Sequence, residues 1–281
     1  MVALQKYQDK KIAIYGMGIT GCSAAKTFKR LKAKVFCWDD NEKIRKKIKN
    51  LKFPINKFWL NTESIDAIVI SPGIDISKCK IRNYLKKNLK KIITDLDLFF
   101  ELNRNASIIS ITGTNGKSTT CKIIEKILKT AGFKTTTVGN IGKPILFSKN
   151  LNNKNIFILE VSSYQLEYSK PIRSKHAAIL NITPDHLERH GTFSSYVKAK
   201  LKLIRTQTNK DYSFLNVNNK LFKKEKFVWK DKTYKNHNKL MKSYEGADGI
   251  KTGYLAIEKL CKYLECKVYL FVSKIFSHYK I

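Results

Sequence analysis

A glycine-rich loop between a predicted strand and a predicted helix constrains this chain more than any other feature. Ser107–Ile111 is a short apolar run typical of a buried strand, and Thr119–Ala131 has the spacing of a helix. Between them lies the loop Gly113–Ser118, with the sequence GTNGKS. In this order the backbone N–H groups of the loop and the start of the helix face one point, which favours the binding of phosphate groups.

The residue types in this loop indicate what it binds. Lys117 stands where an ammonium group contacts the β- and γ-phosphates of a nucleotide, and Ser118 offers a hydroxyl group to Mg²⁺. Ile111 occupies the place of the first glycine in the general GxxxxGK[ST] pattern, so the loop departs from that pattern. A chance glycine- and threonine-rich turn is the alternative, and the order of strand, loop and helix argues against it. We therefore predict a P-loop.

A second glycine-rich loop, Gly16–Gly21 with the sequence GMGITG, follows a predicted strand at Lys11–Tyr15 and opens a helical stretch at Cys22–Leu31. This placement permits a tight turn whose N–H groups face a pyrophosphate. Asp39 lies eighteen residues further on at a strand end, where a carboxylate that reads a ribose or a base is expected. The alternative is that the glycines only permit close packing. An NAD-dependent oxidoreductase would use this loop but would leave GTNGKST unexplained.

Strand and helix patterns alternate along most of the chain, which is typical of parallel, doubly wound α/β sheets. Further strands are expected at Val35–Trp38, Ala67–Ile70, Phe157–Val161, Ala177–Asn181 and Ser213–Val217, and a helix at Thr94–Asn103. After about Phe222 the sequence becomes rich in lysine and in turn-forming residues. We predict a Rossmann-like N-terminal domain over residues 1–105, a truncated P-loop α/β domain over residues 106–222 and an unassigned tail over residues 223–281.

Basic residues outnumber acidic ones, 55 to 22, which gives a formal net charge of +33. Such a balance suits nucleic acid, an anionic membrane surface or phosphorylated small molecules as partners. The lysines are dispersed, and neither an arginine-rich block nor a nucleic-acid-binding module is recognisable. Lys, Asn and Ile recur even in loops such as Asn150–Asn155, which favours compositional drift as the source of most of the charge. We therefore expect no nucleic-acid partner.

Cysteine spacing and hydropathy narrow the class further. The six cysteines are scattered without CxxC spacing, so neither a disulfide framework nor a zinc site is expected. Residues 1–11 are polar and lead directly into a strand pattern, so we expect no signal peptide. No apolar run approaches the ~20 residues of a membrane-spanning helix. The expectation is a cytoplasmic protein without a membrane partner.

Several motifs, above all the GTNGKST loop, resemble those of the Mur ligases and the related folylpolyglutamate synthetases. The motifs most similar to those of the D-glutamate-adding Mur ligases are YGMGITG at residues 15–21, SPGI at residues 71–74, GNIG at residues 139–142, LEVSSYQLE at residues 159–167, NITPDH at residues 181–186 and YVKAK at residues 196–200. The resemblance extends from about Ile12 to about Asn219. It implies an N-terminal domain that binds a UDP-sugar and a central domain that binds ATP.

The resemblance also implies an activity: an ATP-dependent amide-bond ligase of peptidoglycan synthesis that adds D-glutamate to UDP-N-acetylmuramoyl-L-alanine. In such ligases a substrate carboxylate attacks the γ-phosphate of ATP to give an acyl phosphate, and an amine then displaces phosphate. Positioning and charge neutralisation dominate phosphoryl transfer of this kind. The resemblance assigns ATP binding to Gly113, Thr114, Asn115, Gly116, Lys117, Ser118 and Thr119. A monomer that acts on small molecules is expected.

By the same resemblance, Ser118, Glu160, His186 and Lys200 are expected to ligate Mg²⁺, and Lys117, His186 and Lys200 are the expected catalytic residues. Lys200 matches the family lysine that takes up CO₂ to become a carbamate, since Mg²⁺ would repel an unmodified ammonium group. Simpler alternatives are that Glu160 is a surface carboxylate, that His186 caps a turn or helix, and that Lys200 is a solvated charge on a lysine-rich helix.

Substrate binding is assigned by resemblance to both domains. Ile19, Thr20, Asp39 and Asp40 match residues at the uridine end of the UDP-sugar. Ser71, in the SPGI motif, is assigned to the same substrate. Asn140 and Ser162 match residues that face the substrate near the metal ions.

The C-terminal tail departs from this resemblance. The ligases need a third domain that closes over ATP, and we find no match to it beyond Asn219. DGIKTGY at residues 248–254 is instead similar to the KTG-box region of D-alanyl-D-alanine carboxypeptidases. Scattered SxxK and SxN triplets lie inside ligase-like segments, so peptidase activity is not expected. We expect a hybrid reading frame joined near Leu221–Lys226, with impaired catalysis; the alternative is a non-catalytic fragment that only binds nucleotide or UDP-sugar.

Overall fold

The computed structural model describes residues 2–60, 64–140, 143–147, 155–208 and 211–215. The chain divides into two compact units. The first unit comprises Met1–Arg104, Lys143–Leu151 and Ser163–Ile172, and the second unit comprises Asn105–Gly142, Asn152–Ser162 and Arg173–Ile281. Each unit contains one parallel sheet with helices, which confirms the predicted α/β class.

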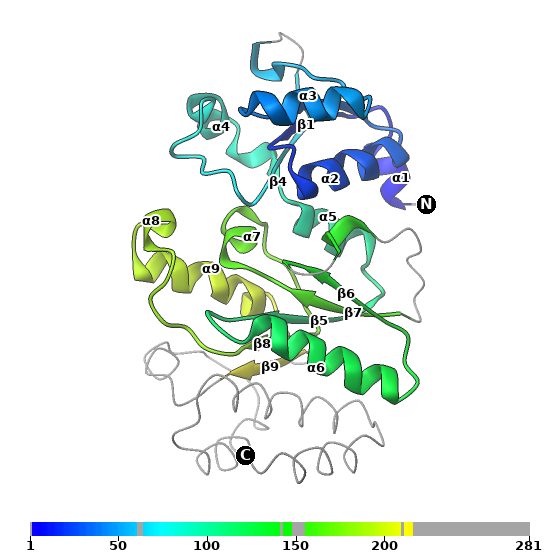
Figure 1. Cartoon of the computed structure of the whole chain (residues 1–281), viewed down its shortest axis with the longest axis vertical. Coiled ribbons are helices and arrows are strands. Elements are labelled where there is room, and N and C mark those ends of the chain that lie inside the picture. Colours follow the sequence, from blue (N-terminus) through cyan, green and yellow to red (C-terminus); the bar gives the residue numbers. More distant parts are fainter. Residues whose placement is uncertain (1, 61–63, 141–142, 148–154, 209–210, 216–281) are drawn as a thin grey trace. The chain divides into compact units, whose positions relative to one another are not determined.

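The first unit is built on a four-stranded parallel sheet with the order β2-β1-β3-β4. Figure 1 labels β1 and β4 of this sheet and the helices from α1 to α5. β1 (Lys11–Tyr15) lies between β2 (Lys34–Trp38) and β3 (Ala67–Ile70), and β4 (Ile92–Ile93) pairs with β3. The side chains from Ile12 to Tyr15 are fully buried on both faces of the sheet. Burial on both faces explains why β1 reads as a continuous apolar run rather than as an alternating one.

Among the helices of the first unit, α3 and α5 follow a residue whose side chain accepts from a free backbone N–H group. The helices are α1 (Val2–Tyr7), α2 (Ile19–Arg30), α3 (Glu42–Asn50), α4 (Arg82–Lys87), α5 (Asp95–Leu102) and α7 (Ser163–Tyr168), with 3-10 turns η1 (Phe58–Leu60), η2 (Leu89–Lys91) and η3 (Ile145–Phe147). Before α5, the Thr94 hydroxyl accepts from the N–H of Asp97, and the Asp97 carboxylate accepts from the N–H of Thr94. This reciprocal capping fixes the point at which the helix begins.

The second unit is built on a five-stranded parallel sheet with the order β6-β7-β5-β8-β9. β5 (Ser107–Thr112) is central, and β7 (Ile156–Glu160) and β8 (His176–Ile179) flank it. β6 (Thr135–Gly139) pairs with β7, and β9 (Tyr212–Leu215) pairs with β8. The chain therefore enters the sheet at its centre and extends it on both sides in turn.

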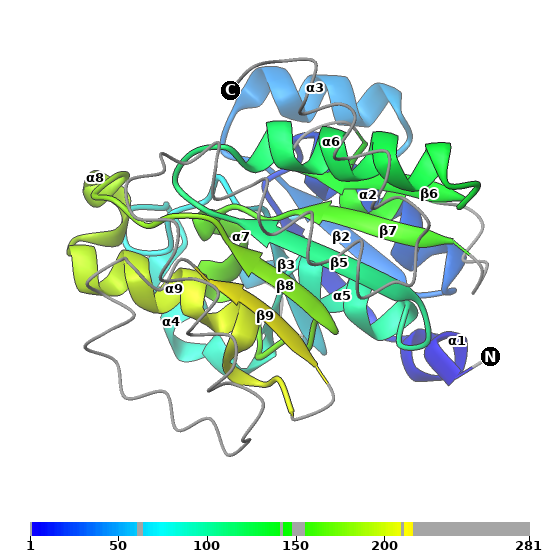
Figure 2. The same cartoon turned by 90° about the horizontal axis from the view of Figure 1, so that it is seen from below.

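Helix α6 (Lys117–Thr130) packs on this sheet through one apolar face. The buried cluster between helix and sheet includes Ile109, Ile111, Ile124, Leu128 and Ile158. α8 (Leu187–His190) leads into α9 (Phe193–Arg205), and Figure 2 shows α6 and α9 on opposite faces of the sheet. The two helices thus cover the central strands from both sides.

Strand positions predicted from the sequence agree with the structure to within two residues. Helix starts were less accurate: α6 begins at Lys117 rather than Thr119, and α2 begins at Ile19 rather than Cys22. Both predictions were wrong for one reason, because each glycine-rich loop passes directly into its helix. Strand β4 and the short helices were not predicted because they have few residues. Strand β6 was not predicted because its sequence TTTVG has no apolar run.

Some predictions fall outside the described residues. The tail over residues 223–281, with its DGIKTGY segment and the expected join near Leu221–Lys226, is among them. The domain boundaries therefore stay predictions, although the two compact units do divide between Arg104 and Asn105. Over the described ranges, every helix is too short or too polar to cross a membrane.

Candidate active site

Three neighbouring strands of the second unit end at the same edge of its sheet. β5 leads into the loop Gly113–Gly116, β7 ends at Glu160, and β8 ends two residues before Asn181. β5 lies between β7 and β8, although both follow it in the chain. The chain therefore adds strands first on one side of β5 and then on the other side. Such a switch point leaves a crevice beyond the carboxyl ends of the strands, which is where ligands bind in parallel α/β sheets.

The loop after β5 turns sharply into α6. Gly116 precedes the first turn of α6 and has a φ of 83°, in the left-handed region that favours glycine. The N–H of Thr120 donates to the Gly116 carbonyl oxygen at 3.0 Å, so helical hydrogen bonding starts at once. The first-turn N–H groups of a helix have no partner within the helix. At this edge of the sheet they suit an anion such as a phosphate.

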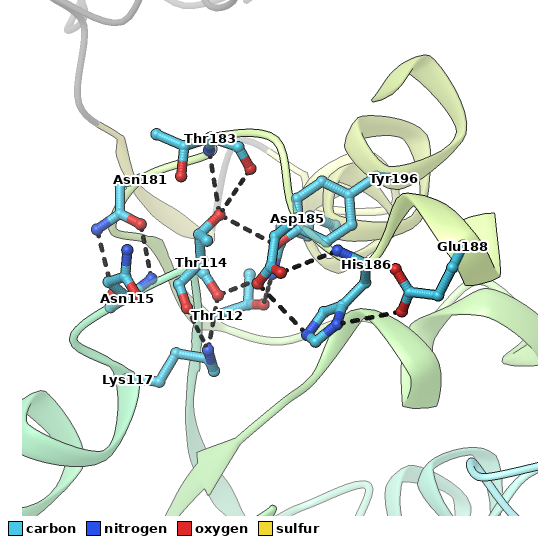
Figure 3. Close-up of polar contacts among 12 residues, drawn as sticks. Thr112, Thr114, Asn115, Lys117, Asn181, Thr183, Asp185, His186, Glu188 and Tyr196 are labelled. Carbon is cyan, nitrogen blue, oxygen red and sulfur yellow. Dashed lines mark hydrogen bonds and ion pairs between the residues drawn. The ribbon is translucent and has the colours of Figure 1, made fainter. Parts of the chain in front are cut away.

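Lys117, the first residue of α6, folds back onto the loop. Its Nζ donates to the carbonyl oxygens of Gly113 at 2.9 Å and Thr114 at 2.8 Å (Figure 3). Burial lowers the pKa of this ammonium group, and the carboxylates of Glu160 and Asp185 oppose that shift. A charged phosphate oxygen is a stronger hydrogen-bond acceptor than a neutral carbonyl oxygen. A bound nucleotide can therefore replace the two carbonyl oxygens as the partner of Lys117 Nζ.

Glu160, the last residue of β7, is a carboxylate with only 1% exposure. Ser118 Oγ donates to its Oε2 at 2.9 Å, and Asn140 Nδ2 donates to its Oε1 at 3.2 Å. Both donors are neutral, so they orient the carboxylate without cancelling its charge. A buried carboxylate is costly without a compensating cation. The alternative that Glu160 is an ordinary surface carboxylate is therefore wrong.

The end of β6 fixes the other side of Glu160. The N–H of Asn140 donates to the Glu160 carbonyl oxygen at 3.1 Å. Gly139 has a φ of 121°, and a Cβ added there would overlap the same carbonyl oxygen. Only glycine permits this close approach of two backbones. Ser162, the other predicted substrate residue here, lies two residues beyond Glu160 and is half-buried.

Lys200, on α9, is 1% exposed, so the alternative of a solvated charge is wrong. Its Nζ donates to the Gly113 carbonyl oxygen at 2.8 Å and to Thr112 Oγ1 at 3.5 Å. Burial lowers the pKa of this ammonium group to about 7, and the charge of Lys117 acts in the same direction. The two lysines thus share one carbonyl oxygen, and two adjacent ammonium groups favour an anion between them.

Tyr196 connects the loop to α9 and to two histidines. Its hydroxyl group lies 3.0 Å from Thr114 Oγ1, and Lys200 Nζ lies 4.7 Å from the centre of its ring. The rings of His190 and His186 approach it edge-on at 5.3 Å and 6.4 Å between centroids. Because Tyr196 is 1% exposed, it holds these groups in one packed cluster.

His186 precedes α8 in a left-handed conformation with a φ of 53°. Its Nε2 lies 3.4 Å from Asp185 Oδ2, and its Nδ1 lies 3.8 Å from Glu188 Oε1. Figure 3 shows the ring between these two carboxylates. His186 is the N-cap residue of α8, and its carbonyl oxygen accepts from the N–H groups of Arg189 and His190. The capping alternative thus holds for its backbone, whereas its side chain makes no capping hydrogen bond and is 44% exposed, so the ring is accessible to a ligand.

Ser118 and Glu160 are the part of the predicted metal site that the structure brings into contact. A hydroxyl and a carboxylate oxygen beside a phosphate-binding loop fit Mg²⁺, which binds through few carboxylates, water and phosphate oxygens. In the described ranges no group of three or more His, Cys, Asp or Glu side chains could hold a metal ion. His186 and Lys200 lie around the same loop, and their role as ligands stays a prediction.

In the first unit, side chains after β2 and β3 hold the glycine-rich loop that follows β1. Ser71, directly after β3, donates its Oγ to the Gly16 carbonyl oxygen at 2.5 Å. Asp39, directly after β2, is 8% exposed and accepts from the N–H of Met17 at 2.6 Å. The strand order places this loop at the switch point between β1 and β3. Both predicted substrate residues therefore have a structural task as well.

The remaining predicted substrate residues of the first unit differ in accessibility. The Asp40 carboxylate accepts from the Tyr15 hydroxyl at 2.5 Å and from Trp38 Nε1 at 3.1 Å. Ile19, the first residue of α2, is 76% exposed, and Thr20 beside it is half-buried. Ile19 and Thr20 thus lie open at a helix N-terminus, whereas the Asp40 side chain is already engaged.

Two contributors to the site in the second unit were missed in the sequence. Asn181 binds both backbone polar groups of Asn115, and Tyr196 joins the loop to α9. Both residues belong to motifs that the sequence shows, but a motif does not state which atoms its members touch. For Asn181 the available signal was its position just after a strand that flanks β5.

The fold and the site define a parallel α/β protein with a P-loop, and comparison with known proteins gives its family. The family model of the Mur ligase middle domain matches residues 111–261, which is more than half of the chain. A second model, described as Mur ligase MurD-like, N-terminal domain, matches residues 10–93. The chain belongs to the Mur ligase family.

Two curated relatives share one name. The UDP-N-acetylmuramoylalanine–D-glutamate ligase of Wolbachia pipientis wMel is 39% identical over 208 residues, which cover 72% of this chain and 40% of the relative. The ligase of the same name from Clostridioides difficile (strain 630) is 36% identical over 225 residues, which cover 77% and 50%. The chain spans about half the length of the curated relatives it matches.

A solved structure supports the fold. The UDP-N-acetylmuramate:L-alanyl-gamma-D-glutamyl-meso-diaminopimelate ligase from Neisseria meningitides superposes with a TM-score of 0.50 at 16% identity, over 76% of this chain and 73% of that one.

Proposed function

We propose that this chain is an ATP-dependent amide-bond ligase that joins D-glutamate to UDP-N-acetylmuramoyl-L-alanine. The observation that carries the proposal is the Ser118–Glu160 pair beside the phosphate loop, since a buried carboxylate and a hydroxyl there suit the magnesium of a nucleotide. The name of the curated relatives supports the choice of substrates. The proposal includes ATP and Mg²⁺ as cofactors and a monomer that acts on small molecules in the cytoplasm.

The loop residues bind ATP in this proposal. The N–H groups at the start of α6, from Lys117 to Thr119, face the phosphates, whereas those of Thr114 and Asn115 donate to Asn181. The Lys117 ammonium group exchanges its carbonyl partners for phosphate oxygens. A positive charge at this position stabilises the charge that develops on the transferred phosphoryl group.

Glu160 and Ser118 would hold Mg²⁺, with His186 and a carbamate of Lys200 near the substrate carboxylate. The metal supplies neutralisation of phosphate charge when it is bound. The carbamate would form when the Nζ lone pair of Lys200 attacks the carbon of CO₂. As the C–N bond forms, one C=O π bond opens onto its oxygen, and the nitrogen loses a proton to solvent. The burial of Lys200, with its lowered pKa, favours the neutral amine that this reaction needs.

The ligation itself takes two displacements. A carboxylate oxygen of UDP-N-acetylmuramoyl-L-alanine attacks the γ-phosphorus of ATP, and ADP leaves with the electrons of the broken P–O bond. The nitrogen of D-glutamate then attacks the acyl carbon, inorganic phosphate leaves, and the amine loses a proton to solvent. Asn140, which donates to Glu160, and Ser162, two residues after Glu160 in the chain, are proposed to orient the acyl group.

The first unit would bind the UDP-sugar at its own switch point. Ile19 and Thr20 lie at the N-terminus of α2, where a diphosphate is favoured. Asp39, Asp40 and Ser71 are proposed to shape this site, mainly through the contacts that hold its loops.

The test is phosphate release by the full chain with ATP, Mg²⁺, UDP-N-acetylmuramoyl-L-alanine and D-glutamate. Turnover that needs all four components, and that is lost in Lys117→Ala, is the expected result. ATP binding without turnover would support the alternative of a chain that only binds its ligands. Nucleotide binding that is unchanged by Lys117→Ala would contradict the assignment of the loop.

A further inference from the structure

The phosphate loop is attached along one side to the segment that follows β8. Five hydrogen bonds join residues 114 and 115 to residues 181 and 183. The N–H of Thr114 donates to the Asn181 carbonyl oxygen at 3.0 Å, and Thr114 Oγ1 bonds both the carbonyl oxygen and the N–H of Thr183. Figure 3 shows these contacts on the side of the loop away from Lys117.

The side chain of Asn181 makes the part of this attachment that a backbone cannot make. Its Oδ1 accepts from the N–H of Asn115 at 2.9 Å, and its Nδ2 donates to the Asn115 carbonyl oxygen at 3.1 Å. A carboxamide carries the same donor and acceptor as a peptide group, so it can satisfy both polar groups of one residue. The orientation of the Asn115 peptide groups in turn sets the direction of the chain into Gly116.

We infer that Asn181 is a positioning residue that holds the phosphate loop in the shape that receives nucleotide phosphates. This inference rests on the proposed function of the loop. A loop that is already ordered loses no further conformational entropy when the ligand binds. Ordering a flexible backbone residue costs about 1–2 kcal/mol, so a loop held in shape avoids that cost at each residue. Asn181 does not need to touch the nucleotide to have this effect.

The same attachment aligns the loop with His186. Asn181 and His186 belong to one short segment, and Thr183, between them, is bound through its backbone to Thr114. A loop fixed to this segment therefore keeps its position relative to the backbone that carries His186. Loss of the Asn181 side chain would release one of the two anchors and leave the Thr114–Thr183 anchor in place.

The experiment compares the full chain with Asn181→Ala and with Asn155→Ala as a matched control. Asn155 lies in the same unit and donates its Nδ2 to Thr136 Oγ1 at 3.0 Å, far along the sheet from the loop. Dissociation constants for ATP, ADP and AMP with Mg²⁺ are measured by calorimetry, together with the melting temperature. Loss of two hydrogen bonds predicts that Asn181→Ala weakens ATP binding by about tenfold or more.

The comparison of nucleotides separates positioning from general loosening. AMP reaches the loop with a single phosphate, so its affinity should change by less than about twofold, and Asn155→Ala should change none of the three. Equal losses for ATP, ADP and AMP, or an Asn181→Ala variant that binds ATP like the wild type, would overturn the inference.

Hydrogen exchange in the absence of ligand tests the same inference independently of nucleotide binding. Faster exchange at the N–H groups of Asn115 and Gly116 in Asn181→Ala is expected, and unchanged exchange would contradict a positioning role. A wild-type chain that does not bind ATP would refute the proposed function alone. Should Asn181→Ala not fold, Asn181→Asp keeps the acceptor for the Asn115 N–H and loses only the donor. It should show the same pattern at high ionic strength, where the added charge is screened.

Discussion

At the scale of single residues, burial changes what a charged side chain can do. Lys200 would be a solvated ammonium group on most lysine-rich helices, but here it is 1% exposed, lies against the ring of Tyr196 and donates hydrogen bonds to Gly113 and Thr112. Removal from water penalises the charged form and lowers its pKa. A buried amine near neutrality is a nucleophile, whereas an exposed one is mostly a cation.

Lys200 is therefore expected to form a carbamate near neutral pH. A neutral amine is available above its pKa of about 7, so the carbamate should increase as the pH rises through that value. Carbon-13 NMR with labelled bicarbonate measures it directly. Lys200→Met should remove the signal, and Lys198→Met, an exposed position on the same helix, should keep it. A signal of equal size in both variants would contradict this assignment.

Asp95 makes stability depend on pH in the sense opposite to most carboxylates. It is 2% exposed, its Oδ1 has no hydrogen-bond partner, and burial raises its pKa to about 7. Since the unfolded value is about 3.9, the folded state binds more protons between about pH 4 and 7. The stability contributed by the protonated acid is thus present below this window and falls by up to about 1.4 kcal/mol per pH unit as the pH rises through it.

Asp95→Asn, which mimics the protonated acid, should therefore gain stability over the wild type as the pH rises from about 5 to about 8. Urea unfolding at both pH values gives the comparison. Asp66→Asn is the control of opposite sign, because a hydrogen bond from the Lys11 N–H lowers the pKa of Asp66. That variant should lose stability at neutral pH and match the wild type in acid. A difference in unfolding free energy between Asp95→Asn and the wild type that does not vary with pH would contradict the raised pKa of Asp95.

At the scale of helices and strands, the sequence predicted what depends on local pattern and missed what depends on contact. The strands from β1 to β9 that carry long apolar runs were predictable because burial on both faces demands such runs. The P-loop and Glu160 were predictable because they follow such strands. The role of Asn181 and the edge strand β6 were not, since each is defined by a partner distant in the chain.

Gly139 shows how one such contact limits the sequence. Its positive φ and the overlap of any Cβ with the Glu160 carbonyl oxygen are separate costs. Gly139→Ala should lower the melting temperature through both of them, with strain alone costing roughly 1–3 kcal/mol. Gly132→Ala is the control, because Gly132 has a φ of 85° but open space around it. Equal decreases in melting temperature for the two variants would show that the contact with Glu160 is unimportant.

At the scale of the whole molecule, the same arrangement of strand, glycine-rich loop and helix occurs in both units. Each unit is a parallel sheet whose first strand lies inside the sheet, and in each a glycine-rich loop leads from that strand into a helix. The parallel α/β class of both sheets could be expected from the alternating patterns, whereas the order of the strands was not predicted. Which ligand each loop receives depends on side chains that the topology does not specify.

The two loops are therefore expected to bind their ligands independently of one another in mutational tests. Ile19→Glu places a negative charge at the exposed N-terminus of α2, which should weaken binding of the UDP-sugar by about tenfold and leave ATP binding intact. Lys117→Ala should have the reverse effect. Calorimetry with each ligand on each variant is the measurement. Loss of both ligands in either variant would contradict two separate sites.

The shared carbonyl oxygen of Gly113 has a consequence for how a nucleotide enters. In the ligand-free loop this oxygen accepts hydrogen bonds from both Lys117 and Lys200. An incoming phosphate must replace it as a partner of Lys117, so binding exchanges one hydrogen-bond acceptor for another and is not a simple addition. The Gly113 carbonyl oxygen then keeps Lys200 as its remaining lysine partner. The arrival of a phosphate at α6 therefore changes the hydrogen bonding of a side chain on α9.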